Sequence, residues 1–304
     1  MIEVQDLRKE YGGFVAVEGS SFSVGRGEVF GVVGPNGAGK TTTLKILAGL
    51  IEPTDGTAVV ARHPAGDPAM QRTLGFLPEE SPLYEEMTAT AYLEFFADLY
   101  DVPRDVASAR ITEALDRLDL EHRDREIGNM SKGMKRKVAI ARALVNDPEV
   151  LIFDEPASGL DPLTTNYIVE FTRELSEAGK TIVFSAHNLF HVESICDRVI
   201  IMTEGEIVAR GTLEEIREAH GGTSYHVYAT VDAGIGEAVR ENGHVRHVVS
   251  DMEAVDRVRD CAEADGGRVI DIQTHTPSLE EIFLDVAGRE GEPPEARAGY
   301  EESG

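Results

Sequence analysis

The sequence contains few cysteines, few lysines and no long apolar run. Its two cysteines, Cys196 and Cys261, lie far apart and suggest neither a disulfide framework nor a metal site. The longest apolar stretches, such as 150–153 and 182–184, have the length of strands and fall far short of the roughly 18–20 residues that cross a bilayer. Residues 1–6 carry no basic or apolar leader. We therefore expect a globular protein of a reducing cytoplasm that spans no membrane itself.

Positive charge is also scarce. The chain has 55 Asp and Glu residues against 29 Lys and Arg residues, which gives a formal net charge of −26 at pH 7. This charge repels a phosphate backbone and argues against a nucleic-acid partner. We hypothesise an adaptation to a high-salt cytoplasm, where screening weakens self-repulsion; a base composition that favours arginine codons, with an acidic tail, is the alternative. Equal thermal stability at about 0.1 M and about 2 M salt would count against the salt hypothesis.

Strand and helix patterns alternate in the first part of the chain. The sequence predicts an antiparallel edge, then a core strand at 28–33, and a helical insertion at about 88–145. From 133 to 213 strands and helices follow each other in turn, which is typical of a mainly parallel sheet flanked by helices. We therefore expect an α/β domain with a mixed sheet core over residues 1–220. The predicted edge strands lie near 2–7, 14–17 and 22–24.

A second, smaller unit follows the pair Gly221–Gly222, which the sequence indicates as a linker. We expect a small α+β domain over residues 223–288. Residues 289–304 are rich in Glu, Gly and Pro and have little to bury, so we expect a disordered tail. In the small domain the predicted strands lie near 225–231, 245–249 and 269–273, and the predicted helices near 237–241 and 253–264.

A glycine-rich segment lies between the core strand and a predicted helix at 41–48. Glycines let successive backbone N–H groups face phosphate oxygens, a lysine neutralises the β- and γ-phosphates, and a threonine hydroxyl can ligate Mg²⁺. A glycine-rich turn with an unrelated lysine is the alternative, but the flanking strand and helix favour a phosphate-binding loop. We expect Lys40 to act in catalysis and Thr41 to bind the metal. The predicted nucleotide-binding residues here are Gly34, Pro35, Asn36, Gly37, Ala38, Gly39, Lys40, Thr41 and Thr42.

Two carboxylates follow the apolar strand pattern at 150–153. Asp154 is a candidate to hold Mg²⁺, directly or through water, and Glu155 a candidate to polarise the attacking water as a general base. On its own, an acidic pair at the end of a strand is more often a solvated turn. After a phosphate-binding loop, the catalytic interpretation is favoured.

With a phosphate-binding loop and an acidic pair in this order, residues 1–213, approximately, resemble the nucleotide-binding subunits of ABC transporters. These subunits have a P-loop NTPase fold. Ser131 and Gly133 match the family's signature motif, whereas the residue after each of them departs from it. The resemblance implies that Ser131 and the N–H groups at Gly133 close on the γ-phosphate held by a second copy. A capped helix with a basic first turn is the alternative. Asp161 resembles the D-loop aspartate, in the segment that links the two sites across the dimer.

Three further residues are singled out by the same resemblance. His187 resembles the switch histidine that contacts the γ-phosphate and positions water. Tyr11 is a candidate for stacking on adenine, although core packing would explain it equally well. Glu79 stands where the family places a glutamine that senses Mg²⁺ and contacts the membrane partner. A carboxylate there can ligate Mg²⁺ but cannot donate a hydrogen bond.

The resemblance implies an ATP-binding and ATP-hydrolysing subunit that powers an ABC transporter as a homodimer with two shared MgATP sites. The membrane-spanning permease would lie on a separate chain, so this chain would be cytoplasmic and peripheral on the inner face of the membrane. Residues 277–284 resemble an extension found on the ATP subunits of drug, antibiotic and sodium exporters, which favours export. The alternatives are an ABC ATPase of repair or translation and an ATP-gated scaffold without turnover. The short stretch of sequence between the phosphate loop and the acidic pair disfavours an ATPase of repair or translation. The presence of both Glu155 and His187 disfavours a scaffold without turnover.

Overall fold

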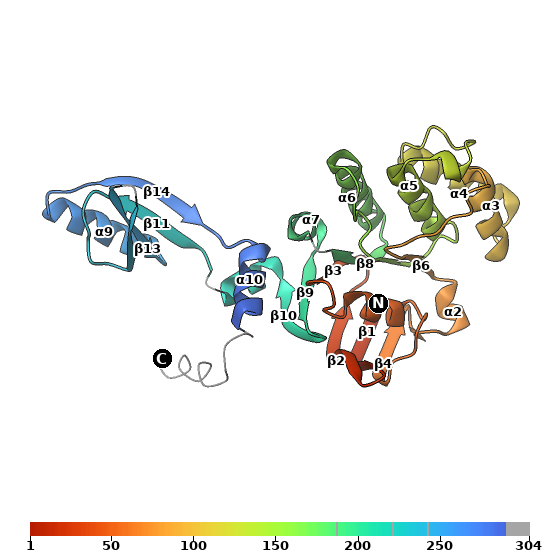
Figure 1. Cartoon of the computed structure of the whole chain (residues 1–304), viewed down its shortest axis with the longest axis horizontal. Helices are drawn as coiled ribbons and strands as arrows, with labels where there is room; N and C mark the ends of the chain where they lie inside the picture. The colour runs from red at the N-terminus through yellow and green to blue at the C-terminus, as the bar shows by residue number, and fades with distance from the viewer. Residues whose placement is uncertain (187, 221, 242, 290–304) are drawn as a thin grey trace. The chain divides into compact units, whose positions relative to one another are not determined.

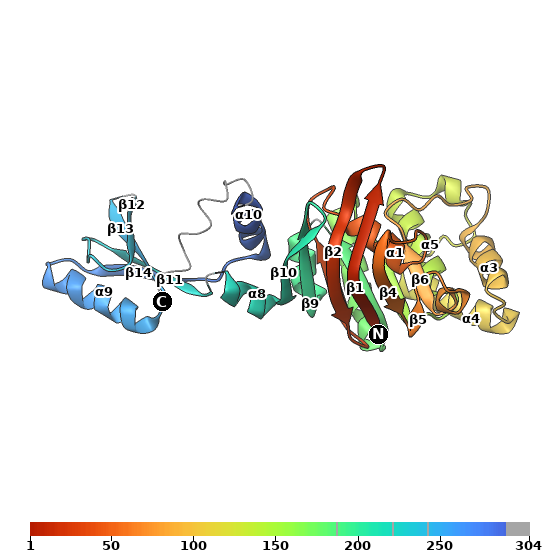
Figure 2. The same cartoon turned by 90° about the horizontal axis from the view of Figure 1, so that it is seen from below.

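The computed structural model of the chain describes residues 1–186, 188–220, 222–241 and 243–289. Two compact units are present, the first covering Met1–Arg210 and the second beginning at Gly211 (Figures 1 and 2). The sequence places the boundary at Gly221–Gly222 instead. The difference concerns α8 (Leu213–Ala219), which packs against α10 (Leu279–Arg289) of the second unit.

The first unit is built on a six-stranded sheet. Strand β3 (Val29–Val33) pairs in parallel with β8 (Thr181–Ala186) and β9 (Arg198–Thr203). Strand β7 (Val150–Phe153) pairs in parallel with β6 (Leu74–Leu77) and β8. Every residue of β3, β7 and β8 is buried, because helices or a second sheet cover both faces. This arrangement confirms the α/β fold class with a mainly parallel core. In spatial order the strands are β10 (Glu206–Thr212), β9 (Arg198–Thr203), β3 (Val29–Val33), β8 (Thr181–Ala186), β7 (Val150–Phe153) and β6 (Leu74–Leu77).

The predicted antiparallel edge is a separate four-stranded sheet, in the order β2 (Phe14–Val24), β1 (Ile2–Tyr11), β4 (Asp55–Val60) and β5 (His63–Pro64). The two strands predicted near 14–17 and 22–24 are one long strand, so that prediction is wrong. Gly19 has a positive φ of 59° within β2, and the register with β1 shifts near it. A bulge of this kind interrupts the alternation of apolar and polar residues without ending the strand.

Helix α1 (Lys40–Leu47) lies between the two sheets and supplies the centre of the core. Its residues Leu44, Ile46 and Leu47 are fully buried among side chains of both sheets. Phe22 of the antiparallel sheet and Phe30 of the parallel sheet stack with ring centroids 5.3 Å apart. This apolar packing holds the start of α1 close to the end of β3, so the loop that connects them must turn sharply.

Helices cover the other face of the parallel sheet, opposite the antiparallel sheet (Figure 1). Among them, α5 (Lys132–Leu144) packs against α3 (Ala89–Leu99) and α4 (Arg104–Arg117). These three helices form the helical subdomain that the sequence predicts as an insertion. Beside them lie α6 (Pro162–Glu177) and α7 (Leu189–Ile195).

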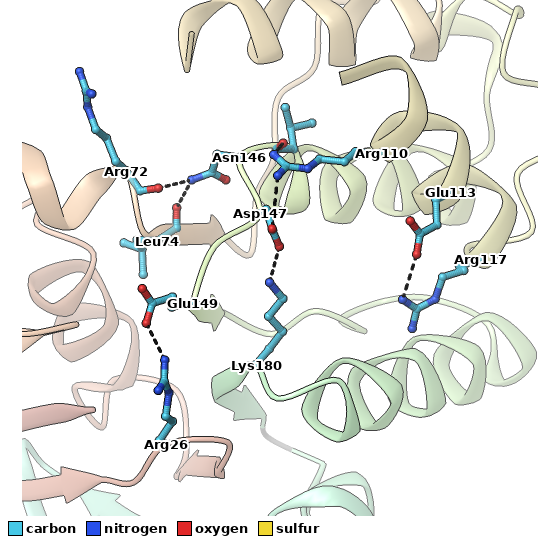
Figure 3. Close-up of polar contacts among 11 residues, drawn as sticks. Arg26, Arg72, Leu74, Arg110, Glu113, Arg117, Asn146, Asp147, Glu149 and Lys180 are labelled. Atoms are coloured by element: carbon cyan, nitrogen blue, oxygen red, sulfur yellow. Dashed lines mark hydrogen bonds and ion pairs between the residues drawn. The ribbon is translucent and has the colours of Figure 1, made fainter. Parts of the chain in front are cut away.

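The turn between α5 and β7 ties the helical subdomain to the sheet (Figure 3). Asn146 Nδ2 donates to the backbone oxygen of Leu74, the first residue of β6, at 3.2 Å. The Asp147 carboxylate accepts a hydrogen bond from Lys180 and lies 3.3 Å from Arg110 Nη2 of α4. The hydrogen bond from Lys180 is the main cause of a lowered pKa of Asp147. One short turn thus joins the subdomain to β6 and to Lys180, the residue before β8.

The second unit is a four-stranded antiparallel sheet with helix α9 (Met252–Ala264) on one face. Val227, Val249, Val255 and Val258 form its small core. The strand order is β12 (Glu237–Glu241), β13 (His244–Val249), β11 (Ser224–Ala229) and β14 (Val269–His275). These elements give the expected α+β composition.

The prediction of a helix at 237–241 in the second unit is wrong. Residues 237–241 form strand β12, which pairs with β13 so that Glu237 lies opposite Val248 and Glu241 opposite His244. Five residues make a poor helix on their own, and the hydrogen bonds of the hairpin decide their conformation. The Asn-Gly pair at 242–243 is a hairpin signal that the sequence reading overlooked. Within the described part of the chain, no helix has the length and apolarity that a bilayer crossing requires. The tail predicted as disordered, except for Arg289, lies outside the described residues.

The two cysteines differ in environment, and we expect them to differ in reactivity. Cys196 is buried beside β3, and burial strongly raises the pKa of its thiol, whereas Cys261 is exposed on α9. Because the thiolate is the reactive form, a disulfide reagent should modify one thiol per native chain at neutral pH. Both should react after unfolding in guanidinium chloride. Rapid modification of both thiols in the native protein, at similar rates, would contradict the packing described for Cys196.

Candidate active site

The glycine-rich loop connects the end of β3 to the start of α1. Its residues Gly34, Gly37 and Gly39 all have positive φ angles, of 153°, 86° and 97°. A Cβ atom on Gly34 would lie 2.2 Å from the backbone oxygen of Met202, and one on Gly39 would lie 2.4 Å from that of Ala16. Neighbouring strands therefore press against the loop, and only glycine fits at these two positions.

Lys40 turns back over this loop. Its ammonium group donates to the backbone oxygens of Gly34 at 2.8 Å and Pro35 at 3.1 Å. It also lies 3.7 Å from Glu155 Oε1, and the side chains of Lys40 and Glu155 are only 6% and 7% exposed. A lysine cation is thus held at the place where a phosphate bound by the loop would lie.

The acidic pair follows β7 at the same edge of the sheet. Asp154 is buried, and its Oδ1 accepts hydrogen bonds from Ser185 Oγ at 2.7 Å and from Thr41 Oγ1 at 3.4 Å. The N–H of Glu155 donates to Ser185 Oγ at 2.9 Å. Because β3, β7 and β8 are parallel, their carboxyl ends bring the loop, the acidic pair and Ser185 together.

Ser185 is a site residue that the sequence reading missed. It is fully buried near the end of β8. The other residues of this strand are apolar, with the exception of Thr181. A lone hydroxyl in such a strand is the signal that could have identified it, because buried polar groups need partners. Its hydroxyl group orients both members of the acidic pair.

The oxygen atoms around Thr41 and Asp154 fit a magnesium ion. Mg²⁺ prefers a few hard oxygen ligands and keeps the rest of its shell for water and substrate phosphates. A threonine hydroxyl and a carboxylate that already lie 3.4 Å apart are ligands of this type. Among the described residues no group of three or more His, Cys, Asp or Glu could hold a metal. At this site Mg²⁺ would take its remaining oxygen ligands from water and a bound phosphate.

A cavity of about 370 Å³ lies over the loop. Pro35 to Thr42 line its floor, Glu155 and Glu79 lie on its wall, and Tyr11 with Phe14 forms an aromatic rim. Tyr11 and Phe14 face each other across the β1–β2 hairpin, and both side chains are exposed. Tyr11 is therefore not a core residue. Phe14 was missed by the sequence reading, although its place in the same hairpin as Tyr11 was a usable signal.

Glu79 follows β6, which is parallel to β7, so it comes to the same edge as the acidic pair. Its carboxylate is exposed on the cavity wall, and its backbone oxygen accepts a hydrogen bond from Arg136 at 2.9 Å. Arg136, on α5, is a second residue that the sequence reading missed. It is 8% exposed, and burial lowers its pKa to about 10 against the opposing effect of Asp154 and Glu79.

The residues of the predicted signature motif and D-loop lie outside the cavity over the phosphate loop. Ser131 caps α5 and accepts a hydrogen bond from Met134 N at 3.2 Å, while Asp161 caps α6 and accepts one from Thr164 N at 3.0 Å. The hydrogen bonds from Thr164 lower the pKa of Asp161. Neither Ser131 nor Asp161 lines the cavity over the phosphate loop, and Gly133 does not line it either. The predicted switch residue His187 lies outside the described residues.

Comparison with known proteins agrees with this geometry. Residues 17–158 match the family described as ABC transporter, and residues 211–287 match the family described as ATP-binding protein DrrA1-3-like, C-terminal domain. The linearmycin resistance ATP-binding protein LnrL of Bacillus subtilis (strain 168) is 34% identical over 95% of this chain and 99% of its own length. The Nod factor export ATP-binding protein I of Burkholderia orbicola (strain AU 1054) is 34% identical over 95% of this chain and 97% of its own length.

A solved structure extends the likeness to the fold. The dimeric structure of the ATP-binding cassette MJ0796, in a post-hydrolysis state bound to ADP and Pi, superposes with a TM-score of 0.64 at 26% identity. The match covers 70% of this chain and 99% of that chain. The chain therefore belongs to the ATP-binding proteins of ABC transporters and is an ATPase whose hydrolysis of ATP to ADP and phosphate is coupled to transport.

Proposed function

We propose that MgATP binds in the cavity over the phosphate loop and that the residues at this edge of the sheet carry out its hydrolysis. The observation that supports this most directly is that hydrogen bonds join Thr41, Asp154 and, through Ser185, Glu155, and that Lys40 forms an ion pair with Glu155. Backbone N–H groups of the loop would bind the phosphates, and Lys40 would exchange its contact with Glu155 for the β- and γ-phosphate oxygens. Tyr11 and Phe14 offer an apolar rim for the adenine.

Each residue then has one task in the reaction. Glu155 accepts a proton from the attacking water, whose oxygen forms a bond to the γ-phosphorus as the bond to ADP breaks. Lys40 offsets the negative charge that the phosphate oxygens carry. Thr41 and Asp154, with Glu79 on the cavity wall, would hold Mg²⁺, which when bound neutralises phosphate charge and orients the β- and γ-oxygens. His187 would position the water and contact the γ-phosphate.

We propose further that the working form is a homodimer with two shared ATP sites. Ser131, Gly133 and Asp161 do not line the cavity of their own chain, and Ser131 and Asp161 cap the helices α5 and α6. Helix α5, which Ser131 caps, can donate N–H groups at its N-terminus to an anion brought by a second copy. The dimeric MJ0796 cassette supports this arrangement by its similarity in fold.

A permease on a separate chain is the third part of the proposal, with this protein bound to it at the inner face of the membrane. Helix α3 of the helical subdomain and the segment before it carry an exposed apolar surface, formed by Tyr84, Phe95 and Leu99. The rings of Tyr84 and Phe95 are 5.8 Å apart, and Leu99 follows Phe95 by one helical turn. The relative named for Nod factor export favours an exporter. The acidic composition supports the further hypothesis of a high-salt cytoplasm.

Glu155→Gln tests the chemical step and the dimer together. Glutamine keeps the shape of the side chain but cannot take up the proton, so the rate of ATP hydrolysis should fall by about 10²–10⁴-fold. The variant should still bind MgATP and should shift from monomer to dimer with it, as measured by light scattering after size exclusion. A variant that hydrolyses ATP at the wild-type rate, or stays monomeric with saturating MgATP, would contradict these assignments.

Leu99→Asp and Phe95→Asp test the contact with the permease. Leu99 is 62% exposed, so its variant should fold and keep its basal ATPase activity; Phe95 is 38% exposed and contacts the rings of Tyr84 and Phe96, so its variant is used only if its thermal unfolding shows that it is folded. A charge on this surface should prevent co-purification with a membrane-spanning partner. The matched control is Met252→Asp, an exposed apolar residue of the second unit. Co-purification at the wild-type level by both test variants would show that the permease binds elsewhere.

A further inference from the structure

Arg136 is a buried cation whose short hydrogen bonds all reach backbone oxygens of the active site. We propose that it is a positioning residue for ATP hydrolysis, which fixes the backbone of Glu155 and joins it to the segment at Glu79. This inference rests on the proposed role of Glu155 as the general base. Arg136 itself touches no reacting group in this arrangement and acts through the residues that it holds.

One side of the guanidinium group holds the acidic pair. Arg136 Nη2 donates to the backbone oxygens of Asp154 at 3.0 Å and Glu155 at 2.8 Å, and Nε donates to that of Pro156 at 2.7 Å. Three successive carbonyl groups therefore point at one side chain. Only a guanidinium group has donors spread widely enough, and in one plane, to serve them together.

The other side holds the segment that comes after β6. Arg136 Nη1 donates to the backbone oxygens of Pro78 at 2.7 Å and Glu79 at 2.9 Å, and lies 3.4 Å from Ser81 Oγ. This segment and the acidic pair extend from two parallel strands, which pair as far as Leu77 and Phe153. One more main-chain hydrogen bond, from Asp154 N to Leu77 O, continues the pairing, and beyond it Arg136 joins the two segments.

The backbone at Glu155 needs this support. Its φ angle is +46°, a left-handed conformation that costs energy for a residue with a side chain. Ser185 holds its N–H and Arg136 holds its C=O, so both peptide groups around the strained residue are fixed. The carboxylate is thereby directed toward Lys40, at the wall of the cavity.

Through the same contacts, Arg136 connects Glu79 on the cavity wall with Glu155, the proposed general base. Glu79 is exposed on the cavity wall, and its carbonyl shares Nη1 with that of Pro78. A displacement of the segment at 78–81 therefore pulls on the group that holds Glu155. The burial-lowered pKa of about 10 still leaves Arg136 protonated at neutral pH, so the link is intact under ordinary conditions.

A double-mutant cycle with Glu155 tests the proposal. Arg136→Lys keeps the charge but concentrates the donors on one nitrogen, which cannot serve both segments. In the otherwise wild-type chain it should lower kcat by about 10²-fold, the loss expected when a catalytic group is misplaced. In the Glu155→Gln chain it should change the residual rate less than about threefold, because the residue through which it acts is already disabled. Rates are expressed per MgADP-binding site, so that loss of folded protein does not count.

Binding separates positioning from a general structural role. The affinity of Arg136→Lys for MgADP, measured by calorimetry, should stay within about threefold of the wild type while kcat falls. Arg136→Gln, which is neutral and also has fewer donors, should behave in the same way. The matched control is Arg142→Lys, further along α5, whose guanidinium donates to Tyr92 Oη and stacks on Phe96 away from the site. It should leave kcat unchanged.

Three results would overturn the role of Arg136. The first is an equal fall in rate in the two backgrounds, the second is a fall in MgADP affinity that parallels the fall in kcat, and the third is loss of nucleotide binding by both Arg136 variants. The Glu155→Gln parent reports separately on the proposed function. Wild-type turnover by that parent would remove the assignment of Glu155, whereas equal effects in the two backgrounds remove only that of Arg136.

Discussion

The buried contact between Lys40 and Glu155 is the interaction on which the site depends. Two charged side chains, both nearly inaccessible to water, are costly to bury unless each finds an opposite charge and further hydrogen bonds. Lys40 has both, because the loop turns the oxygens of Gly34 and Pro35 toward its ammonium group. Lys40 Nζ and Glu155 Oε1 are 3.7 Å apart, which is longer than a hydrogen bond. The oxygens of a bound phosphate can therefore replace Glu155 as the partner of the lysine.

The fold makes this contact available through its parallel strands. Four of them end at one edge of the sheet, so segments far apart in the sequence meet there without long connections. The helical subdomain stands over the same sheet and is tied to its other edge by Asp147. The proposed function places the chemistry at this edge and the permease contact on the helical subdomain, and Arg136 on α5 reaches from the subdomain into the site.

The sequence predicted those parts of the site that are contiguous. The phosphate loop could be recognised from Gly34 to Thr41 because its chemistry lies in consecutive residues, and the acidic pair because it follows an apolar strand. Ser185 and Arg136 were missed because their roles arise from neighbours in space, 30 residues away in the case of Ser185 and Glu155. The helix predicted at 237–241 failed for the same reason, since the conformation of this short segment depends on pairing with β13. Phe14 was missed although it lies in the same short hairpin as Tyr11. Gly19 hid the continuity of β2 by permitting a bulge.

In the proposed function, the cation over the loop, Lys40, is the group that receives the nucleotide's phosphates. The most direct test is the equilibrium affinity of Lys40→Met for MgATP, measured by isothermal titration calorimetry on protein whose thermal unfolding shows that it is folded. Loss of charge-assisted hydrogen bonds worth about 1.5–3 kcal/mol predicts an affinity at least about tenfold lower than that of the wild type. An affinity within about twofold of the wild type would contradict the account, because it would mean that the phosphates bind without Lys40.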